Sequence, residues 1–398
     1  MKKFLLAFII ILFSYTNQAY AEESKNMDLI DKTYHNLFFE ENIENKFDPS
    51  FLKVIKYSDI KNILNSIKKD SGKYLGYKLL SDKEIELDFE KATIQSAINF
   101  SAENKINGIW FGEVNLKKID LNEVIETIKK LEGINSITIR KNGKNFINHN
   151  SNLPLGVGSA FKLFILKELY NRVEKGQESL SKVVYLDKNK FSLPGGFLHS
   201  WPDKTPITLA TLANLMISQS DNTATDFLVD YLGRDNIEKL APESTKPLFK
   251  TLEMFKIKGL LKKEEIENFL SKNLKDKKIF LKEIEKLDKN KINFPETPYF
   301  IDKIEWLIST EELCKIIESL GENNALSINN SGLIKNNWNF VGFKGGSEPG
   351  VVNLTYLLKK GSDTYSLSFT LNNSKRSIKN DEFINLISKT ISGLYLSE

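Results

Sequence analysis

Apolar residues recur at helical spacing early in the chain and then give way to short strand-like runs. Helices are predicted over Met27–Glu41 and Tyr57–Lys69, where apolar side chains return every three or four residues. Gly72 follows the second helix, as a C-terminal glycine should. The next four runs are rich in β-branched and aromatic residues and predict strands: KYLGYKLL, KEIELDFE, TIQSAINFSA and INGIWFGEV. Two helices followed by strands predict a small α+β domain that ends near Leu121.

The pattern changes again from Asn122 onward. NEVIETIKKL is helical, and SITIRKNGKNFINHN is two strands around Asn142-Gly143, a good hairpin signal. Most of the remaining chain is helical, including the Lys/Glu-rich segment Lys262–Lys291, which we interpret as a solvated surface insertion or, as the minor alternative, a partner-binding segment. Three strands, FVGFKGG, VVNLTYLLKK and TYSLSFTLNN, and a final helix close the chain. This order predicts an antiparallel sheet assembled from both ends of the domain, with a helical lobe between them.

The first residues have a pattern of their own. Lys2 and Lys3 precede the apolar run Phe4–Phe13, and Ala19-Tyr20-Ala21 comes shortly after it. A basic start, an apolar run too short to span a bilayer and a small-x-small site predict a secretory signal, residues 1–21, cut after Ala21. The alternative is an uncleaved membrane anchor. The signal predicts a periplasmic or secreted protein with no stable membrane insertion, and it leaves predicted domains at residues 22–121 and 122–398.

Composition narrows the classes of chemistry. The chain is 41% hydrophobic and 27% charged, which is typical of a folded protein, and its 398 residues suit two or three domains. Loss of Lys2 and Lys3 with the signal lowers the net charge from +4 to +2, which gives no reason to expect a nucleic-acid partner. Cys314 is the single cysteine and the three histidines are far apart in sequence. An internal disulfide is therefore excluded, and we expect no metal, no cofactor and no Cys-His catalysis.

The first candidate motif is Ser159-Ala160-Phe161-Lys162 in LGVGSAFKLFILKELY. It opens a helix that is apolar nearly all round, and such a helix belongs in a core. Ser159 would lie at the first turn, where free backbone N–H groups and the helix dipole favour negative charge. Lys162 would lie on the same face, one turn deeper. A buried lysine loses its charge readily, and a neutral amine beside a hydroxyl is a competent general base.

The spacing alone is a weak signal in so Lys-rich a chain. Other pairs share it, and three of them are interpreted as exposed helix positions or caps: Ser58-Lys61, Ser66-Lys69 and Ser179-Lys182. For Ser159 the alternative is an N-cap serine with an incidental lysine. The catalytic interpretation is favoured because Lys162 has almost no polar face on its helix to occupy.

The second candidate is Ser220-Asp221-Asn222 in MISQSDNTATDFL, where three residues typical of caps and turns separate two helix-like runs. Ser220 could pass a proton to a leaving nitrogen, and Asn222 could hold a substrate amide or steady Lys162. Asp221 would brace the turn. The alternative is a plain helix-helix connection in which Asp221 or Asn222 caps the next helix.

The third candidate is the segment Lys344-Gly345-Gly346-Ser347 within a strand pattern. Glycines inside a strand indicate close approach of a ligand or of another backbone. A lysine at this point could receive a substrate carboxylate. The alternative, weighed equally, is a bulged strand that runs into a turn at Glu348-Pro349-Gly350.

Together the three motifs supply a nucleophile, a base, a proton shuttle and an anion anchor. SxxK, SDN and a lysine-glycine strand, in that order, resemble the motif set of class A β-lactamases and penicillin-binding proteins. Longer stretches are similar to β-lactamase-like serine hydrolases with an extra N-terminal domain: GSAFKLFILKELY, SWPDKTPITLATLANLMISQSDNTATDFL, IEWLISTEELCKII and FKGGSEPGVVNL. The resemblance covers roughly Asn122 to Glu398.

The resemblance implies an α/β fold class, in which a β-lactamase or penicillin-binding-protein-like domain, an antiparallel sheet plus a helical lobe, follows a small cone-shaped α+β domain. That first domain resembles the nuclear-transport-factor-2 and steroid-isomerase group over about a quarter of the chain. It shows no polar constellation that demands chemistry, so packing or substrate positioning is the favoured role.

The same resemblance implies a role for each motif residue. Ser159 is the acylated nucleophile, Lys162 its base and Ser220 the proton donor to the leaving nitrogen. Asn222 orients the substrate and Lys344 steers its carboxylate, with Gly345 and Gly346 on the same binding strand. The backbone N–H groups of Ser159 and Ser347 form the oxyanion hole.

The sequence departs from that family in two places. Class A enzymes use a loop glutamate, followed a few residues later by asparagine, to activate the water that releases the acyl group, and no such pair follows Ser220-Asp221-Asn222. The corresponding stretch offers Glu243 and Glu253, of which Glu243 in a Pro-bounded loop is the possible deacylation base. Gly345 also replaces the hydroxyl residue usual after the lysine, and Ser347 could stand in for it. Acylation is thus better supported than deacylation.

Three hypotheses remain for an exported protein acting on a small β-lactam, ester or peptide-like substrate. The leading one is a serine hydrolase of β-lactamase type that works through a Ser159 acyl-enzyme, with a role in antibiotic resistance or β-lactam catabolism. The second is a D-Ala-D-Ala peptidase or an esterase on the same residues. The third is a slow-turnover penicillin-binding protein that senses or sequesters its ligand.

Overall fold

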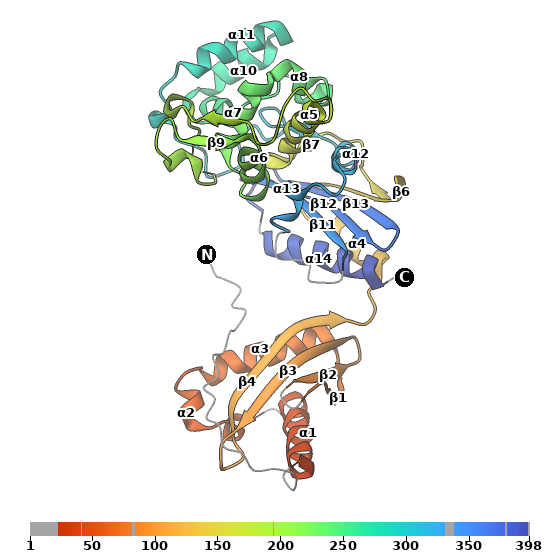
Figure 1. Ribbon diagram of the computed structural model, residues 1–398. Coiled ribbons are helices and arrows are strands. Elements are labelled where there is room, and N and C mark those ends of the chain that lie inside the picture. Colours follow the sequence, from red (N-terminus) through yellow and green to blue (C-terminus); the bar gives the residue numbers. More distant parts are fainter. Residues whose placement is uncertain are drawn as a thin grey trace. The chain divides into compact units, whose positions relative to one another are not determined.

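The computed structural model describes residues 23–40, 42–81, 84–193, 195–330, 338–378 and 380–396. The predicted signal, residues 1–21, lies outside these ranges. The chain divides into two compact units: Leu121–Ile391 forms the second, and the first comprises Met1–Asp120 together with Ser392–Glu398. Each unit is described by itself (Figure 1).

The first unit is a four-stranded antiparallel sheet with two long helices. The strands β1 to β4 are hydrogen-bonded in sequence order, and α1 and α3 pack on the sheet and on each other. Tyr34 from α1, Leu64 from α3 and Leu87 from β2 meet in its core. Its elements are α1 (Glu23–Phe39), α2 (Pro49–Leu52), α3 (Tyr57–Ser71), β1 (Tyr74–Leu79), β2 (Ile85–Phe89), β3 (Ala92–Phe100) and β4 (Ile106–Leu116).

The second unit contains a five-stranded antiparallel sheet in the order β11-β12-β13-β5-β6. Strands from the start and the end of this unit therefore meet, as the hydrophobic pattern predicts. Asn142 and Gly143, both at positive φ (51° and 74°), turn β5 into β6 as the hairpin signal requires. The strands are β5 (Ile134–Lys141), β6 (Lys144–His149), β11 (Phe340–Glu348), β12 (Val351–Lys360) and β13 (Asp363–Asn372).

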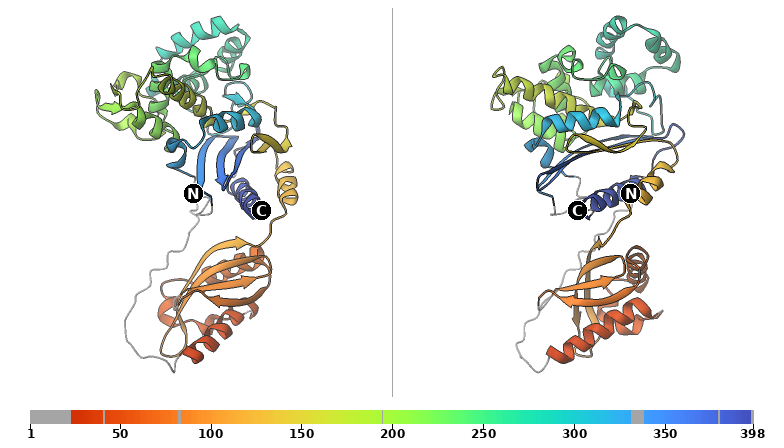
Figure 2. Two further views of the ribbon diagram at one scale, coloured as in Figure 1. Left: turned by 45° about the vertical axis from the view of Figure 1, so that its right-hand side comes forward. Right: turned by 90° about the vertical axis from the view of Figure 1, so that its right-hand side faces the viewer.

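Helices cover both faces of this sheet. The helix α12 (Thr310–Leu320) lies on one face, and α4 (Leu121–Lys129) and α14 (Asn380–Leu396) lie on the other (Figure 2). A capping box starts α12: the Ser309 hydroxyl accepts from the Glu312 N–H at 3.2 Å, and the Glu312 carboxylate accepts from the Ser309 N–H at 3.1 Å. Gly321, at φ 58°, ends the helix.

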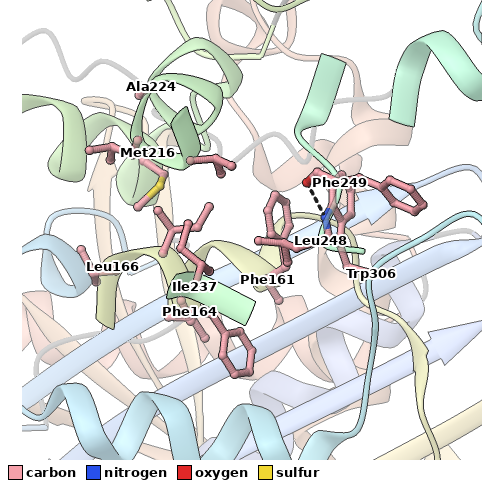
Figure 3. Close-up of a cluster of buried hydrophobic side chains, with 14 of the residues drawn as sticks. Phe161, Phe164, Leu166, Met216, Ala224, Ile237, Leu248, Phe249 and Trp306 are labelled. Atoms are coloured by element: carbon pink, nitrogen blue, oxygen red, sulfur yellow. Dashed lines mark hydrogen bonds between the residues drawn. The ribbon is translucent and has the colours of Figure 1, made fainter. Parts of the chain in front are cut away.

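The helical lobe lies between β6 and β11 in sequence and packs around one apolar core. Phe161, Met216, Leu248 and Trp306 are among its buried members (Figure 3). Its elements are β7 (Leu155–Gly156), η2 (Gly158–Phe161), α5 (Lys162–Glu174), β8 (Val183–Tyr185), β9 (Pro206–Thr208), α6 (Leu209–Ser218), α7 (Asn222–Leu232), α8 (Arg234–Glu238), η5 (Glu243–Thr245), α9 (Thr251–Leu260), α10 (Lys263–Ser271), α11 (Leu274–Glu285), β10 (Leu307–Ile308) and α13 (Asn324–Ser327).

The segment Lys262–Lys291 is more integrated than a solvated insertion. Its helices α10 and α11 bury Ile266, Phe269, Leu281 and Ile284, and these side chains belong to the main core of the lobe. Their lysines and glutamates cover the outer faces. The charge-rich composition correctly indicates an exposed face and hides the apolar stripe beneath it.

The predicted α/β class, with antiparallel sheets and a helical lobe, is confirmed by this arrangement. None of the helices in the described ranges is both long and apolar enough to span a membrane.

Candidate active site

Ser159 lies on a tight turn that leads into α5, whose first five residues are buried. The turn is η2, and Gly158 enters it at φ 50°, a conformation that favours glycine. Phe161 anchors the turn from below because its fully buried ring stacks on Trp306, with centroids 3.9 Å apart and planes at 3°. The Trp306 indole N–H donates to the Phe249 carbonyl at 3.0 Å, which fixes the ring on which Phe161 stacks (Figure 3).

Lys162 begins α5 and is completely buried. Its Nζ donates to the Ser220 carbonyl at 2.7 Å, to Asn222 Oδ1 at 2.9 Å and to Ser220 Oγ at 3.2 Å. Residues three apart eclipse on a 3₁₀ turn, so Ser159 and Lys162 share one face. Burial lowers the pKa of Lys162 well below its usual 10.5, and the charge of Lys344 lowers it further, against the opposing effect of Asp226 and Asp221.

Ser220 lies in the connection between α6 and α7 at φ 54°, a left-handed conformation that is uncommon for residues with a side chain. Such a backbone persists only where its surroundings hold it in place. Here the Asp221 N–H donates to the Leu215 carbonyl at 3.1 Å, and the Asp221 carboxylate caps α7 by accepting from the Ala224 N–H at 2.8 Å. The strained turn projects the Ser220 hydroxyl toward both buried lysines.

A pair of glycines that no sequence motif singled out braces this turn. Gly196, at φ 82°, passes so close that a Cβ there would lie 2.2 Å from Asp221 Oδ2, and the following amides of Phe197 and Leu198 donate to that oxygen at 2.6 and 2.9 Å. Gly195 accepts from the Asn222 N–H at 2.9 Å. The dipeptide Gly-Gly in SLPGGF is the signal that could have indicated this close approach.

Lys344 extends from the edge strand β11 and is also buried. Its Nζ donates to Ser220 Oγ at 3.2 Å and to the Gly345 carbonyl at 2.5 Å. Burial lowers the pKa of Lys344 to about 7. The Ser220 hydroxyl is therefore held between two amines that both lose their charge easily.

The two glycines after Lys344 behave differently. Gly346 faces the nucleophile turn so closely that a Cβ there would lie 2.3 Å from the Ser159 nitrogen. A Cβ on Gly158 would in turn lie 2.7 Å from the Ser347 nitrogen. The backbone amides of Ser159 and Ser347 thus come from two segments in direct contact, as a two-donor anion site requires. Gly345 packs instead against Phe343 and the β12 backbone.

The structure brings together most of the predicted site residues. Hydrogen bonds connect four of them, Lys162, Ser220, Asn222 and Lys344, and backbone contact adds the segments of Ser159, Gly346 and Ser347. Cys314 is buried elsewhere, on α12, and burial raises its pKa. The site therefore offers a hydroxyl, two amines of lowered pKa and paired N–H donors, which together suit acyl transfer.

Glu243 is not brought to this group. It lies in η5, where its side chain is 84% exposed and pairs with Lys246. The neighbouring Ser244 hydroxyl donates to the Leu307 carbonyl at 2.7 Å, which ties η5 to β10. None of the hydrogen bonds in the described residues links the Glu243 carboxylate to Ser159 or its amines.

Two other carboxylates near the lobe core hold backbone in place. Asp226 on α7 accepts from the Thr251 N–H at 2.6 Å and from the Leu252 N–H at 2.9 Å, which caps α9. Glu253 accepts from the Lys250 N–H at 2.8 Å and from Arg234 at 2.5 Å. Both are buried, and burial raises the pKa of each. In the described part of the chain, no group of three or more His, Cys, Asp or Glu side chains could hold a metal ion.

Comparison with known proteins identifies the family to which the second unit is similar. A family model described as "Beta-lactamase enzyme family" matches residues 118–338, more than half of the chain. No curated protein matches the chain significantly. The match begins at residue 118, so it leaves nearly all of the first unit outside, and the resemblance of that unit to the nuclear-transport-factor-2 group stays a prediction.

Several solved structures are similar to this chain. The β-lactamase from Francisella tularensis is similar with a TM-score of 0.51 and 16% identity, over 70% of this chain and 99% of that one. The β-lactamase from Sphaerobacter thermophilus DSM 20745 gives 0.48 and 18%, over 69% and 95% of the two chains. The protein PBP-A gives 0.48 and 14%, over 70% and 96%. The likeness to the Francisella tularensis protein, at 16% identity, indicates a shared fold and not a shared substrate.

Proposed function

This chain belongs to the β-lactamase enzyme family, and we propose that it is a serine hydrolase that opens β-lactams, or related amides and esters, through an acyl-enzyme at Ser159. The observation that carries the proposal is the convergence on one hydroxyl. Lys162 Nζ and Lys344 Nζ each lie 3.2 Å from Ser220 Oγ, and Ser159 is one turn from Lys162.

In the proposed acylation, the neutral amine of Lys162 takes the proton of the Ser159 hydroxyl as Oγ bonds to the substrate carbonyl carbon. The N–H groups of Ser159 and Ser347 donate to the oxygen that becomes negative. The C–N bond then breaks, and Ser220 gives its proton to the leaving nitrogen. The Lys162 ammonium returns a proton to Ser220, so the relay ends neutral.

Substrate positioning is proposed for the remaining residues of the site. Asn222 is fixed by its bond to Lys162 and orients the substrate amide. Lys344 receives the substrate carboxylate. The negative charge of that carboxylate favours the ammonium form of Lys344, so the amine takes up a proton near neutral pH when the substrate binds. Gly345 and Gly346 lie on the strand β11 that lines this side of the site.

A second candidate function, a penicillin-binding protein of slow turnover, is favoured by the state of the nearby carboxylates. Release of the acyl group needs a base that activates water. Glu243 is exposed and paired with Lys246, and Asp226 and Glu253 are committed to capping α9. Because none of these three carboxylates is free to activate water at Ser159, we expect acylation to be faster than deacylation.

We further propose that the protein is exported and acts in the periplasm or outside the cell, with its signal removed after Ala21. Rapid turnover there would support a role in antibiotic resistance or β-lactam breakdown. A mature chain that begins at Glu22, read by intact-mass spectrometry, would support export.

The test combines a fluorescent penicillin, a chromogenic cephalosporin and intact-mass spectrometry over time. Ser159→Ala should abolish covalent labelling while the fold remains, and Ser179→Ala is the matched control because Ser179-Lys182 has the same spacing on the surface. Labelling that persists in Ser159→Ala would refute the assignment of the nucleophile. Fast turnover of the cephalosporin supports the hydrolase, a lasting adduct supports the slow acceptor, and no reaction with either points to a peptidase or an esterase.

A further inference from the structure

A buried cluster of three charged side chains lies outside the residues considered so far. Lys258 comes from α9, Glu305 from the segment before β10, and Glu348 from the end of β11. Lys258 Nζ is 2.5 Å from Glu348 Oε1 and 3.9 Å from Glu305 Oε2, and all three side chains are at most 7% exposed. So many charges are rarely buried together without a reason beyond packing.

The cluster contacts both segments that carry the proposed oxyanion donors. Glu305 Oε1 accepts from the Gly158 N–H at 3.1 Å, and Gly158 directly precedes Ser159. Glu348 directly follows Ser347. Glu305 Oε1 also accepts from its neighbour Trp306 at 3.0 Å, beneath the ring that supports the turn.

The charges of the cluster balance only with one proton on the carboxyls. Two carboxylates and one ammonium would leave a net negative charge away from water. Burial, and then the charge of Glu348, raise the pKa of Glu305 well above its usual range, against the opposing effect of Lys258. Glu305 Oε2 and Glu348 Oε2 are buried without a hydrogen-bond partner among the described residues, although the two carboxyls lie within bonding reach. A proton on Glu305 that is donated to Glu348 satisfies both oxygens.

We propose that Glu305, as a neutral acid bonded to Glu348, is a positioning residue that holds the Ser159 turn against the Ser347 strand so that both backbone donors aim at one oxygen. The inference rests on the proposed function, because it assigns a role in acylation at Ser159. Lys258, on α9, neutralises Glu348. We call Glu305, Glu348 and Lys258 together the clamp.

Loss of the Glu305 proton would open this clamp. Two adjacent carboxylates repel each other, and they lie on the two segments whose contact sets the donor geometry. Lys258 and Glu348 are the charged groups that face Glu305. Lys258 carries one positive charge, which cannot balance two carboxylates. The rate of acylation at saturating probe should therefore fall at alkaline pH. Saturation matters because the titration of Lys344 changes binding over part of the same range.

The experiment compares Glu305→Gln with Glu305→Leu, using the rate of labelling by the fluorescent penicillin between pH 6 and 10. The glutamine keeps an acceptor for Gly158 and a donor for Glu348, so labelling should persist and the alkaline fall should disappear. The leucine removes the acceptor and should slow labelling by about tenfold or more, with a smaller effect on probe affinity. Glu311→Gln, another buried glutamate on α12, is the matched control and should keep the wild-type pH profile.

Two outcomes would overturn the inference: an alkaline fall in Glu305→Gln equal to that of the wild type, or labelling by Glu305→Gln as slow as by Glu305→Leu. If the leucine variant does not fold, the pH profile of the glutamine variant decides alone. Absence of labelling in the wild type would count against the proposed function instead. Amide hydrogen exchange of the segment 157–161 then decides the inference, which requires faster exchange in Glu305→Leu than in the wild type and wild-type protection in Glu305→Gln.

Discussion

Replacement of Lys344 by methionine should make the protein more stable and much less reactive. Lys344 is 3% exposed, and burial is the cause of its lowered pKa. A buried amine that would be charged in the unfolded chain opposes folding, because folding must either desolvate the charge or release the proton. Methionine has a similar length and carries no charge, so it fits the same space without this cost.

The size of the effect is set by the pKa. The value falls from 10.5 in the unfolded chain to about 7 in the fold, and each tenfold change in proton affinity is worth about 1.4 kcal/mol, so the cost is roughly 5 kcal/mol at low pH. Methionine also loses the bonds to Ser220 Oγ and the Gly345 carbonyl, each worth about 1 kcal/mol. We expect Lys344→Met to raise the free energy of unfolding by roughly 2–3 kcal/mol at pH 7.

The sign of the pH dependence is fixed by the direction of the pKa change. A group whose pKa is lowered by folding contributes its full stability above the unfolded pKa and loses it as the pH falls through the folded pKa. The wild-type protein therefore loses stability relative to Lys344→Met as the pH falls from 10.5 toward about 7. The advantage of the variant should be largest at pH 7 and below. It should vanish near about pH 9, where the cost of the buried amine only equals the two lost hydrogen bonds, and become a deficit of roughly 1 kcal/mol at pH 10.

Denaturant unfolding at pH 7 and pH 10 measures this difference, with Lys263→Met as the control for an exposed lysine whose side chain is 68% exposed. The control should change stability by less than about 0.5 kcal/mol at both pH values. Covalent labelling by a carboxylate-bearing penicillin should be weaker in Lys344→Met. The reasoning fails if the variant is less stable than the wild type at pH 7, or if its gain does not shrink at pH 10.

Two further predictions concern the carboxylates around the site. Glu243→Gln should leave the rate of acyl release unchanged because the carboxylate is exposed and pairs with Lys246; a release rate lowered about tenfold in an intact-mass time course would restore Glu243 as the base. Asp226→Asn should lower the free energy of unfolding by about 2 kcal/mol or more, because the N–H₂ that replaces one carboxylate oxygen would face the N–H of either Thr251 or Leu252. Urea unfolding tests it, and an unchanged stability would remove Asp226 as the cap of α9.

The sequence carries most of the local structure. Asn142-Gly143 specifies its hairpin because both residues tolerate positive φ, and the apolar residues after Lys162 specify a helix whose first five residues are buried. Among the five Ser-x-x-Lys pairs of the sequence, which include Ser50-Lys53, that apolar run also distinguishes Ser159-Lys162. Spacing and periodicity suffice in these cases because the interactions span only a few residues.

Contacts between distant segments are a different matter. Gly195-Gly196 braces Asp221 from a loop that carries no other motif, and the segment Lys262–Lys291 hides a buried stripe beneath its charges. Glu305 and Glu348 are separated by 43 positions in sequence, yet both lie beside the same ammonium of Lys258. Neither glutamate has a local pattern that marks it as buried.

The sequence by itself determined the residue types, their order and the short-range turns and helices that present them. Only the tertiary structure decided which amines bond to the Ser220 hydroxyl and are buried away from solvent. It also decided which carboxylates already cap a helix or pair with a lysine. The physical reason is that pKa and reactivity depend on burial and on charges within a few ångströms, and chain folding sets both through contacts that sequence distance does not encode.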